Sequence, residues 1–291
     1  MVDLDCLAAL DCLQWLRTGA RAAEILECSQ PNISRNARKC EKIFGISLKK
    51  KVAEWQLIGD DSLIQAERQV HQLHRWNNGS PLRLDAQHWL RDTYSPLALQ
   101  GWIKGNMNYL DYHQPLNLIK SRIIDAWLCS APDAPQSDEL AAIQLCSMPS
   151  LLVVVRDHPL TDRLDGMTME DIRPYPLLPL PRGSFPIYES VLESLGLQHH
   201  DPAVMSRSSL PAEDLLVGIA SPLTMSLYGP RYVALPIQLP IKVGDVLMVR
   251  TEFVNHPRTQ ALVDDLLQHL QRITQDLPSV ELLGHPAVQA S

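Results

Sequence analysis

The fold of this chain is decided by residues 21–45, which read RAAEILECSQPNISRNARKCEKIFG. The first part predicts a short helix with two adjacent alanines at its contact face. Ser29 follows where it can cap a second helix, and Pro31 fits the first turn of that helix, where a backbone N–H has no helical partner. Gly45 is typical of the residue that ends a helix. The stretch therefore predicts two helices joined by a tight turn.

The second of these helices has an apolar stripe and a basic face. Ile33, Ala37, Cys40 and Phe44 recur at spacings of four, three and four residues, which places them on one side of a helix. The opposite side carries Asn32, Arg35, Arg38, Lys39 and Lys42. A short helix, a tight turn and a second helix with a basic exposed face are the layout of a helix-turn-helix, which binds DNA through the second helix.

The same residues resemble the N-terminal DNA-binding domain of LysR-type transcriptional regulators. The family pattern A-A-x-x-L-x-x-S-Q-P-x-x-S, followed by E-x-x-x-G, is matched by Ala22, Ala23, Leu26, Ser29, Gln30, Pro31, Ser34, Glu41 and Gly45. The chain departs from the family after this point. Residues 48–51 read LKKK where the family has Leu-Phe-x-Arg, and residues 57–61 read LIGDD where it has Leu-Thr-x-x-Gly. An ordinary helical hairpin with a solvated basic face is the alternative interpretation.

Charge is distributed unevenly along the chain. The net charge of the 291 residues is −7, but residues 30–51 hold seven Lys or Arg and one Glu, which gives +6. Residues 80–291 hold 15 basic and 23 acidic side chains, which gives −8. A basic segment of this kind suits a phosphate backbone, and the acidic remainder repels it. The distribution therefore favours double-stranded DNA as a partner of the N-terminal part.

Composition bounds the other classes of protein. A hydrophobic content of 45% and a charged content of 20% are typical of globular domains, and no apolar run is long enough to predict a membrane span. The acidic N-terminus does not resemble a signal peptide, and the six cysteines form no C-x-x-C pair. We therefore expect a cytoplasmic protein with reduced cysteines and no membrane partner.

Two further elements follow the helix-turn-helix. Residues 46–58 predict a two-stranded wing, with Lys49, Lys50 and Lys51 where a wing meets the DNA backbone. Residues 60–77 predict a polar helix with a narrow apolar seam at heptad-like spacing, which the family uses to dimerise. The seam consists of Leu63, Ala66, Val70 and Leu73. His71 and His74 on this helix are expected to lie on a solvated face.

The remainder of the chain predicts an α/β domain with a mostly parallel sheet, because short strands alternate with short helices. Helices are expected near residues 94–104, 115–123, 168–172, 184–195, 211–217 and 257–273. Strands are expected at residues 82–86, 107–113, 125–129, 151–155, 177–180, 233–235 and 243–254. The order resembles the effector-binding domain of the same family, a two-lobed domain like a periplasmic binding protein, in which residues 151–156 and 243–252 would cross between lobes.

The predicted organisation is an N-terminal all-α winged helix-turn-helix with a linker helix, followed by a C-terminal α/β two-lobed domain. The domains are residues 1–59 (winged helix-turn-helix), 60–79 (linker helix and hinge) and 80–291 (sensor), with lobe I at 80–156 and 255–291 and lobe II at 157–254.

The candidate sites follow from these elements. The residues expected to bind DNA are Gln30, Pro31, Asn32, Ser34, Arg35, Arg38, Lys39, Lys49, Lys50 and Lys51. The residues expected to bind a small organic acid are Thr93, Ser95, Ser130, Arg182 and Ser184, which follow strands or begin helices, where free N–H groups favour an anion. Arg182 is the only cation among them.

No motif for catalysis, a phosphate loop or a metal was found, so we expect no enzyme, no cofactor and no metal. His199, His200 and Asp201 adjoin one another, but the sequence offers them no further ligand. The resemblance implies a one-component regulator that binds DNA as a homodimer or homotetramer, and that contacts RNA polymerase if it activates transcription. The alternatives are a regulator that senses no small molecule, a solute-binding protein, and an enzyme on the same two-lobed scaffold.

Overall fold

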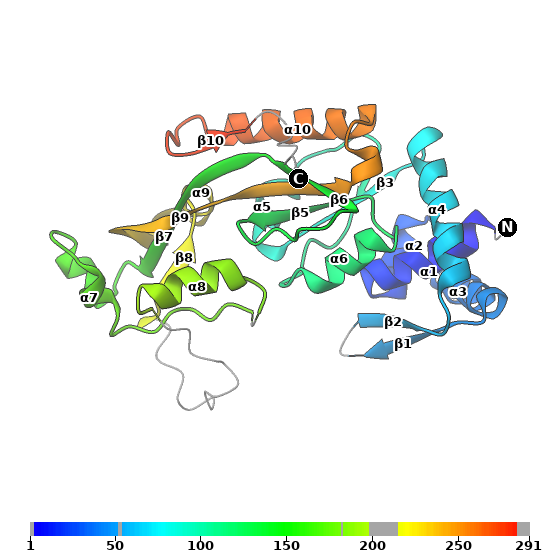
Figure 1. The fold of residues 1–291 in the computed structure, drawn as a ribbon, viewed down its shortest axis with the longest axis horizontal. Helices are drawn as coiled ribbons and strands as arrows, with labels where there is room; N and C mark the ends of the chain where they lie inside the picture. Colours follow the sequence, from blue (N-terminus) through cyan, green and yellow to red (C-terminus); the bar gives the residue numbers. More distant parts are fainter. Residues whose placement is uncertain (1–2, 52–53, 182, 198–214, 284–291) are drawn as a thin grey trace.

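The computed structural model describes residues 3–51, 54–181, 183–197 and 215–283, and it has an elongated shape (Figure 1). The N-terminal elements are α1 (Leu4–Leu16), α2 (Gly19–Ile25), α3 (Gln30–Phe44), β1 (Ser47–Lys51), β2 (Glu54–Ile58) and α4 (Ser62–Asn77). The antiparallel pair β1–β2 follows α3 directly, so these elements form a winged helix-turn-helix with a following helix, as the sequence predicts.

The C-terminal elements build a mixed α/β domain. They are β3 (Leu82–Ala86), α5 (Arg91–Tyr94), β4 (Trp102–Lys104), α6 (His113–Lys120), β5 (Ala126–Ala131), β6 (Leu140–Gln144), β7 (Cys146–Val155), α7 (Met169–Ile172), α8 (Pro186–Ser194), β8 (Gly218–Ala220), α9 (Pro222–Tyr228), β9 (Tyr232–Arg250), α10 (Pro257–Ile273) and β10 (Glu281–Leu282). Within the described residues, none of the helices has the length and apolar character that crossing a membrane requires.

Two long strands join the two lobes. The C-terminal half of β9 pairs with β5 and β6 in lobe I, and its N-terminal half pairs with β7 in lobe II. In Figure 1, β7 and β9 run together from the centre of the molecule toward α7 and α8 at one end. Separate hydrophobic cores lie on the two sides of this connection. The crossings lie within β7 and β9. In β7, Met148 belongs to the core of lobe I, whereas Leu152 and Val154, inside the predicted crossing at residues 151–156, belong to the core of lobe II.

The expectation of a mostly parallel sheet is wrong. Among the described strands, only β3–β4 and β3–β5 pair in parallel. The other pairings in this sheet are antiparallel, because β9 crosses between the lobes in the direction opposite to β5 and β7.

Several local predictions for the sensor domain are also wrong. The helix expected at residues 94–104 does not form: α5 ends at Tyr94, and the chain turns at Gly101 (φ 77°) into β4 at Trp102. Residues 107–113 and 177–180 contribute only one bridge each, Gln87 with Tyr109 and Leu177 with Val217. Most of the helix expected at residues 211–217 lies outside the described residues.

The helix-turn-helix forms for the reasons that its sequence indicates, with one exception. Ile33, Ala37 and Cys40 are buried, and Gly45 ends α3 with a φ of 67°, a left-handed conformation that favours glycine. The exception is Ser29, which occupies the N-cap position of α3 without a side-chain hydrogen bond to the helix.

The winged helix-turn-helix and lobe I share one hydrophobic core. Side chains of α1, such as Leu7 and Trp15, belong to the same buried cluster as Leu118 of α6 and Trp127 of β5. Figure 1 accordingly shows α1 and α2 close to α6. Because this burial removes apolar surface of both parts from water, it holds the two parts together.

Candidate nucleic-acid interface and inter-lobe site

The outer face of α3 is open to solvent. Gln30, Pro31, Ser34, Arg35, Arg38 and Lys39 are exposed, and Asn32 is half-buried. The Arg35 guanidinium donates a hydrogen bond of 3.2 Å to the Asn32 side-chain oxygen, so these two side chains lie side by side. This face presents an amide, a hydroxyl and several cations, which are groups that hydrogen-bond base edges and phosphates.

The three wing lysines are exposed, but they are not equivalent. Side chains alternate along a strand, so Lys49 and Lys51 share one face of β1 and Lys50 lies on the other. The Lys50 ammonium lies 5.6 Å from the centre of the Trp55 ring and donates to the Arg17 carbonyl oxygen at 3.4 Å. Lys50 therefore contacts the end of α1, whereas no such contact involves Lys49 or Lys51 among the described residues.

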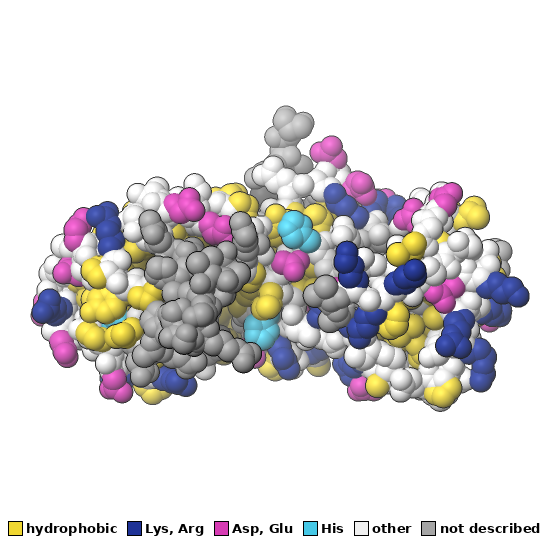
Figure 2. Space-filling view, turned by 90° about the horizontal axis from the view of Figure 1, so that it is seen from below, with side chains coloured by type: hydrophobic (Ala, Val, Ile, Leu, Met, Phe, Trp, Pro, Cys, Tyr) yellow, Lys and Arg dark blue, Asp and Glu magenta, His cyan; other side chains and the backbone are white. Residues whose placement is uncertain are grey.

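Two acidic residues fix the wing against the helices. A Glu41 carboxylate oxygen accepts a hydrogen bond of 2.5 Å from the Leu48 N–H, and a Glu54 carboxylate oxygen lies 2.6 Å from the Arg17 guanidinium. The sequence pattern included Glu41 without revealing this role. The wing and α3 are thus held in one orientation. Figure 2 shows one face of the molecule, and Lys and Arg side chains gather over the half of it where the N-terminal elements lie.

Helix α4 has an exposed apolar face and a buried face that is largely polar. The four seam residues are all exposed, with exposed fractions of 67% for Leu63, 51% for Val70 and 41% for Leu73. The opposite face is buried even though it carries polar and charged side chains: Ile64, Arg68, His71, Gln72, Arg75 and Trp76. The interpretation of His71 as solvated is wrong, because this ring is buried and lies 3.3 Å from a Glu67 carboxylate oxygen.

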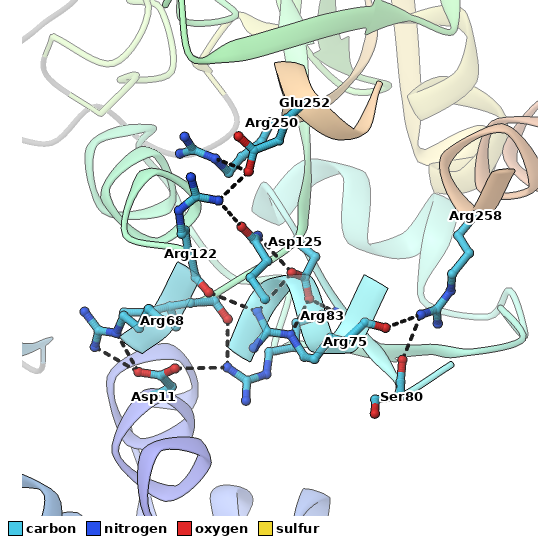
Figure 3. A network of polar contacts seen from close by, with 12 residues as sticks. Asp11, Arg68, Arg75, Ser80, Arg83, Arg122, Asp125, Arg250, Glu252 and Arg258 are labelled. Atoms are coloured by element: carbon cyan, nitrogen blue, oxygen red, sulfur yellow. Dashed lines mark hydrogen bonds and ion pairs between the residues drawn. The ribbon is translucent and has the colours of Figure 1, made fainter. Parts of the chain in front are cut away.

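The buried face of α4 takes part in a polar network that links the helix-turn-helix to lobe I (Figure 3). Arg68 pairs with Asp11 of α1 at 2.8 Å, and Arg83 of β3 reaches the other oxygen of Asp11 at 3.5 Å. Arg75 pairs with Asp125 at 3.0 Å, and the same carboxylate accepts a hydrogen bond of 3.0 Å from Gln72. Every acid in these contacts is buried and paired, as a buried charge requires.

A second polar contact joins the same parts. The Trp15 indole N–H of α1 donates to a carboxylate oxygen of Asp85 in β3 at 2.5 Å. Burial raises the pKa of Asp85 to about 6, although the hydrogen bonds from Ala86, Trp15 and Met107 act in the opposite direction. The Tyr109 hydroxyl donates to the Trp15 carbonyl oxygen at 2.9 Å. Sequence reasoning missed this junction because its residues are far apart in the chain.

Among the described residues predicted to bind an effector, none hydrogen-bonds to another. Thr93 is buried, and its carbonyl oxygen contacts the His269 ring at 2.8 Å. The Ser95 carbonyl oxygen accepts a hydrogen bond from Lys104 of lobe I. Ser130 instead accepts a hydrogen bond of 2.9 Å from the Trp89 indole.

Of the two predicted effector-binding residues beside α8, the structure describes Ser184. Ser184 is buried and does not cap α8, because the N-cap position is occupied by Phe185. Arg182 lies outside the described residues, as do His199, His200 and Asp201. Trp89 of lobe I packs edge-on against the Phe185 ring with 4.9 Å between the ring centres, so aromatic side chains of both lobes meet at this place.

The N-terminus of α8 already binds a carboxylate of the chain itself. The Ile187 and Tyr188 N–H groups donate to the two oxygens of Asp133 at 2.8 and 3.2 Å. Asp133 lies in the loop between β5 and β6 of lobe I, so this contact bridges the lobes. Burial raises the pKa of Asp133, and the two backbone hydrogen bonds oppose the rise. The position expected for an effector carboxylate is therefore filled by a side chain.

The profile of the LysR substrate binding domain family matches residues 106–271, which is more than half of the chain. The chain therefore belongs to the family of LysR-type transcriptional regulators. No sequence among the curated proteins matches it significantly.

Solved structures share its fold. A full-length OxyR variant from Pseudomonas aeruginosa superimposes with a TM-score of 0.57 at 18% identity, covering 93% of this chain and 95% of that one. The probable transcriptional regulator PA0477 from Pseudomonas aeruginosa gives 0.55 at 14% identity, with 91% and 96% covered. ArgP from Mycobacterium tuberculosis gives 0.52 at 15% identity, with 92% and 97% covered.

Proposed function

We propose that the chain is a one-component transcriptional regulator that binds double-stranded DNA in a sequence-specific manner. The observation that carries the proposal is the exposed polar and basic face of α3, next to a wing held in a fixed orientation. In a helix-turn-helix, such a face enters the major groove while neighbouring segments contact the backbone. Membership of a family of transcriptional regulators supports the same conclusion, and chromosomal DNA as the partner implies action in the cytoplasm.

Within this proposal the residues of α3 have two roles. Gln30, Asn32 and Ser34 contact base edges, together with Arg35, because amide side chains suit adenine and guanidinium groups suit guanine. Arg38 and Lys39 contact phosphates, and so do Lys49 and Lys51 in the wing, whereas Lys50 contacts the end of α1. Lysine supplies a point charge without the fork of an arginine, so the wing adds affinity and little sequence information.

The regulator acts as a homo-oligomer in this proposal. The exposed seam of α4 supports it, because four apolar side chains in one stripe lose contact with water when two copies of the helix pair. A two-fold pair of helices places two recognition helices on two half-sites of the DNA. A regulator that activates transcription would also contact RNA polymerase.

A small organic acid in the inter-lobe cleft remains the proposed effector. The contact between Asp133 and α8 limits how it binds: the acid displaces this carboxylate or binds beside it. We expect thermal stability of the full chain to rise with a matching acid, by about 2.7 kcal/mol at a hundred times the dissociation constant. The full chain is used because the helix-turn-helix shares a core with lobe I. No rise with any acid would favour the alternative of a regulator that senses no small molecule.

The DNA-binding proposal is tested with DNA from upstream of the chain's own gene. We expect a gel shift and a footprint, and Arg35→Ala should weaken binding by about 1–3 kcal/mol and relax specificity. Arg163→Ala removes an exposed arginine of lobe II and is the matched control. An Arg35→Ala protein that footprints like the unmodified chain contradicts the assignment of α3, and a chain that shifts no DNA favours a solute-binding protein or an enzyme.

A further inference from the structure

A pocket of about 350 Å³ lies between the helix-turn-helix and lobe I. We call it the α2–lobe I pocket. Arg21 comes from α2, and the lining residues from lobe I are Arg91, Ser95, Lys104, Asn106 and Met107. A volume of this size lies within the range of small-molecule sites in proteins. The function proposed above makes no use of it.

The charged groups at the α2–lobe I pocket are cationic. Three cations line it, one from each of three separate segments, and no Asp or Glu is among its lining residues. The Arg91 guanidinium makes no hydrogen bond or ion pair with any described residue. Arg21 pairs with Glu24 at 2.6 Å, but this carboxylate is 67% exposed and follows on the same helix. The pocket therefore has positive charge that the described residues do not neutralise.

The ammonium of Lys104 is fixed in position. It donates to the carbonyl oxygens of Ser95 and Leu97, the latter at 2.7 Å, and no carboxylate contacts it among the described residues. Two carbonyl oxygens occupy two of the three N–H groups of an ammonium, and the third is free for a ligand. Partial burial lowers the pKa of Lys104, and an anion beside the ammonium would oppose this shift.

The floor of the pocket is held by hydrogen bonds to both parts of the molecule. The Gly105 N–H donates to the Leu84 carbonyl oxygen at 2.8 Å, and the Asn106 side chain donates to the Leu16 carbonyl oxygen of α1 at 3.1 Å. Met107 adopts a φ of 47°, a left-handed conformation that is costly for a residue with a side chain. A floor held to both parts of the molecule presents the lining groups in fixed positions, as a binding site requires.

From this arrangement we infer that the α2–lobe I pocket binds a small phosphorylated anion between the DNA-binding and sensor parts. Three cations that approach from separate segments suit a tetrahedral, doubly charged group, whose oxygens accept hydrogen bonds in several directions. A planar carboxylate would be satisfied by one arginine fork. The bound anion would remove the repulsion among the three cations and would join α2 to lobe I.

The test uses the full chain with inorganic phosphate and pyrophosphate as probes, against sodium chloride at equal ionic strength. We expect the melting temperature of the unmodified chain to rise with the probes. In Arg91→Gln, the dissociation constant for the probe should increase about tenfold or more, because one charge-assisted pair is lost. Arg91 has no partner to lose in the described structure, so this variant should fold normally. Arg163→Gln, an exposed arginine of lobe II, is the matched control and should titrate like the unmodified chain.

A rise that is equal in Arg91→Gln and Arg163→Gln, or no rise above chloride, overturns the inference. The titration contains no DNA, so its result does not depend on the proposed DNA binding. A salt series with DNA then separates the two sources of phosphate. An unchanged log–log slope in Arg91→Gln assigns the pocket to a free anion, whereas a slope reduced by about 0.9 assigns it to a phosphate of the DNA backbone and overturns the free anion.

Discussion

Removing one partner of the buried ion pair between Asp11 and Arg68 should lower the unfolding free energy by several kilocalories per mole, and this is our principal prediction. Asp11 is 1% exposed and Arg68 is 2% exposed, and Asp11 also lies 3.5 Å from the Arg83 guanidinium. In Asp11→Ala, Arg68 would keep only the Gln14 side-chain oxygen, at 2.5 Å. Breaking a buried pair on one side leaves an uncompensated charge, which costs about 3–5 kcal/mol of unfolding free energy.

Urea unfolding followed by tryptophan fluorescence and far-ultraviolet circular dichroism measures this loss. Trp15 and Trp127 lie in the core shared by the helix-turn-helix and lobe I, so fluorescence reports on that core. Glu170→Ala is the control, because its pair with Arg173 at 3.0 Å is exposed and should contribute at most about 1 kcal/mol. The double variant Asp11→Leu with Arg68→Met should recover part of the loss, since apolar side chains then replace this pair, while Arg83 keeps only the Ile123 carbonyl oxygen at 2.9 Å.

The reasoning is refuted if Asp11→Ala lowers the unfolding free energy no more than Glu170→Ala does. It is also refuted if the double variant is less stable than Asp11→Ala, because the loss would then come from the shape of the site and not from an unpaired charge. Coincident fluorescence and dichroism transitions in the unmodified chain are the condition for quoting one free energy.

The wing, the α4 seam and a buried acid of lobe I allow three more tests. Replacing Lys49 and Lys51 by Gln should lower the log–log salt slope of DNA binding by up to about 1.8, while Lys50→Gln should change it little, because Lys50 contacts the end of α1. Leu73→Glu should give monomers in analytical ultracentrifugation and abolish DNA binding, because it puts a charge into the α4 seam. Burial raises the pKa of Asp245 from 3.8 to about 6, so its contribution to stability is present below about pH 4 and is lost as the pH rises through 6. Asp245→Asn should remove roughly 3 kcal/mol of this pH dependence from melting curves between pH 4 and 7.

Each of these outcomes has a control. Equal effects of all three lysines on the salt slope would show that the alternation along β1 does not decide which side chains meet DNA. Leu178→Glu, at another exposed leucine, should leave the oligomer intact, and loss of the oligomer there would remove the special role of the seam. A pH profile that is the same in Asp245→Asn would assign the titration to other buried acids, of which Asp85 is the foremost.

The sequence predicted those elements whose evidence is local. The stripe of α3, the wing and the periodic α10 each show their pattern within a single element, and structure and expectation agree there. Strand β9 was divided into two because Pro236 and Pro240 interrupt its pattern, and proline lacks the N–H that a ladder needs. The β7–β9 pairing accommodates irregularity through shifts of register between Pro149 and Val153.

The candidate site was harder to predict wherever partners are distant in sequence. Arg68 and Arg75 on α4 have the pattern of a solvated face, and only Asp11 and Asp125 make their burial favourable. These acids lie 57 and 50 positions away along the chain, so no window of sequence reveals the pairs. The capping of α8 by Asp133, 54 positions from Ile187, was hidden for the same reason.

The distribution of these contacts determines which parts of the molecule can move independently. The helix-turn-helix is joined to lobe I by a shared core, by the Asp11 pair and by the Trp15–Asp85 hydrogen bond. Besides the continuous strands β7 and β9, the contacts of lobe I with lobe II include Asp133 at the half-buried N-terminus of α8, the Trp89–Phe185 ring pair, and Leu223 of α9, which is buried in the lobe I core. Breaking the Asp133 contact exposes two N–H groups that water can satisfy, whereas breaking the Asp11 pair strands a buried charge. If the proposed effector binds in the cleft, it would therefore move lobe II more readily than it moves the helix-turn-helix against lobe I. In the proposed homo-oligomer, its effect on DNA binding would then pass through contacts that lobe II makes with other copies of the chain.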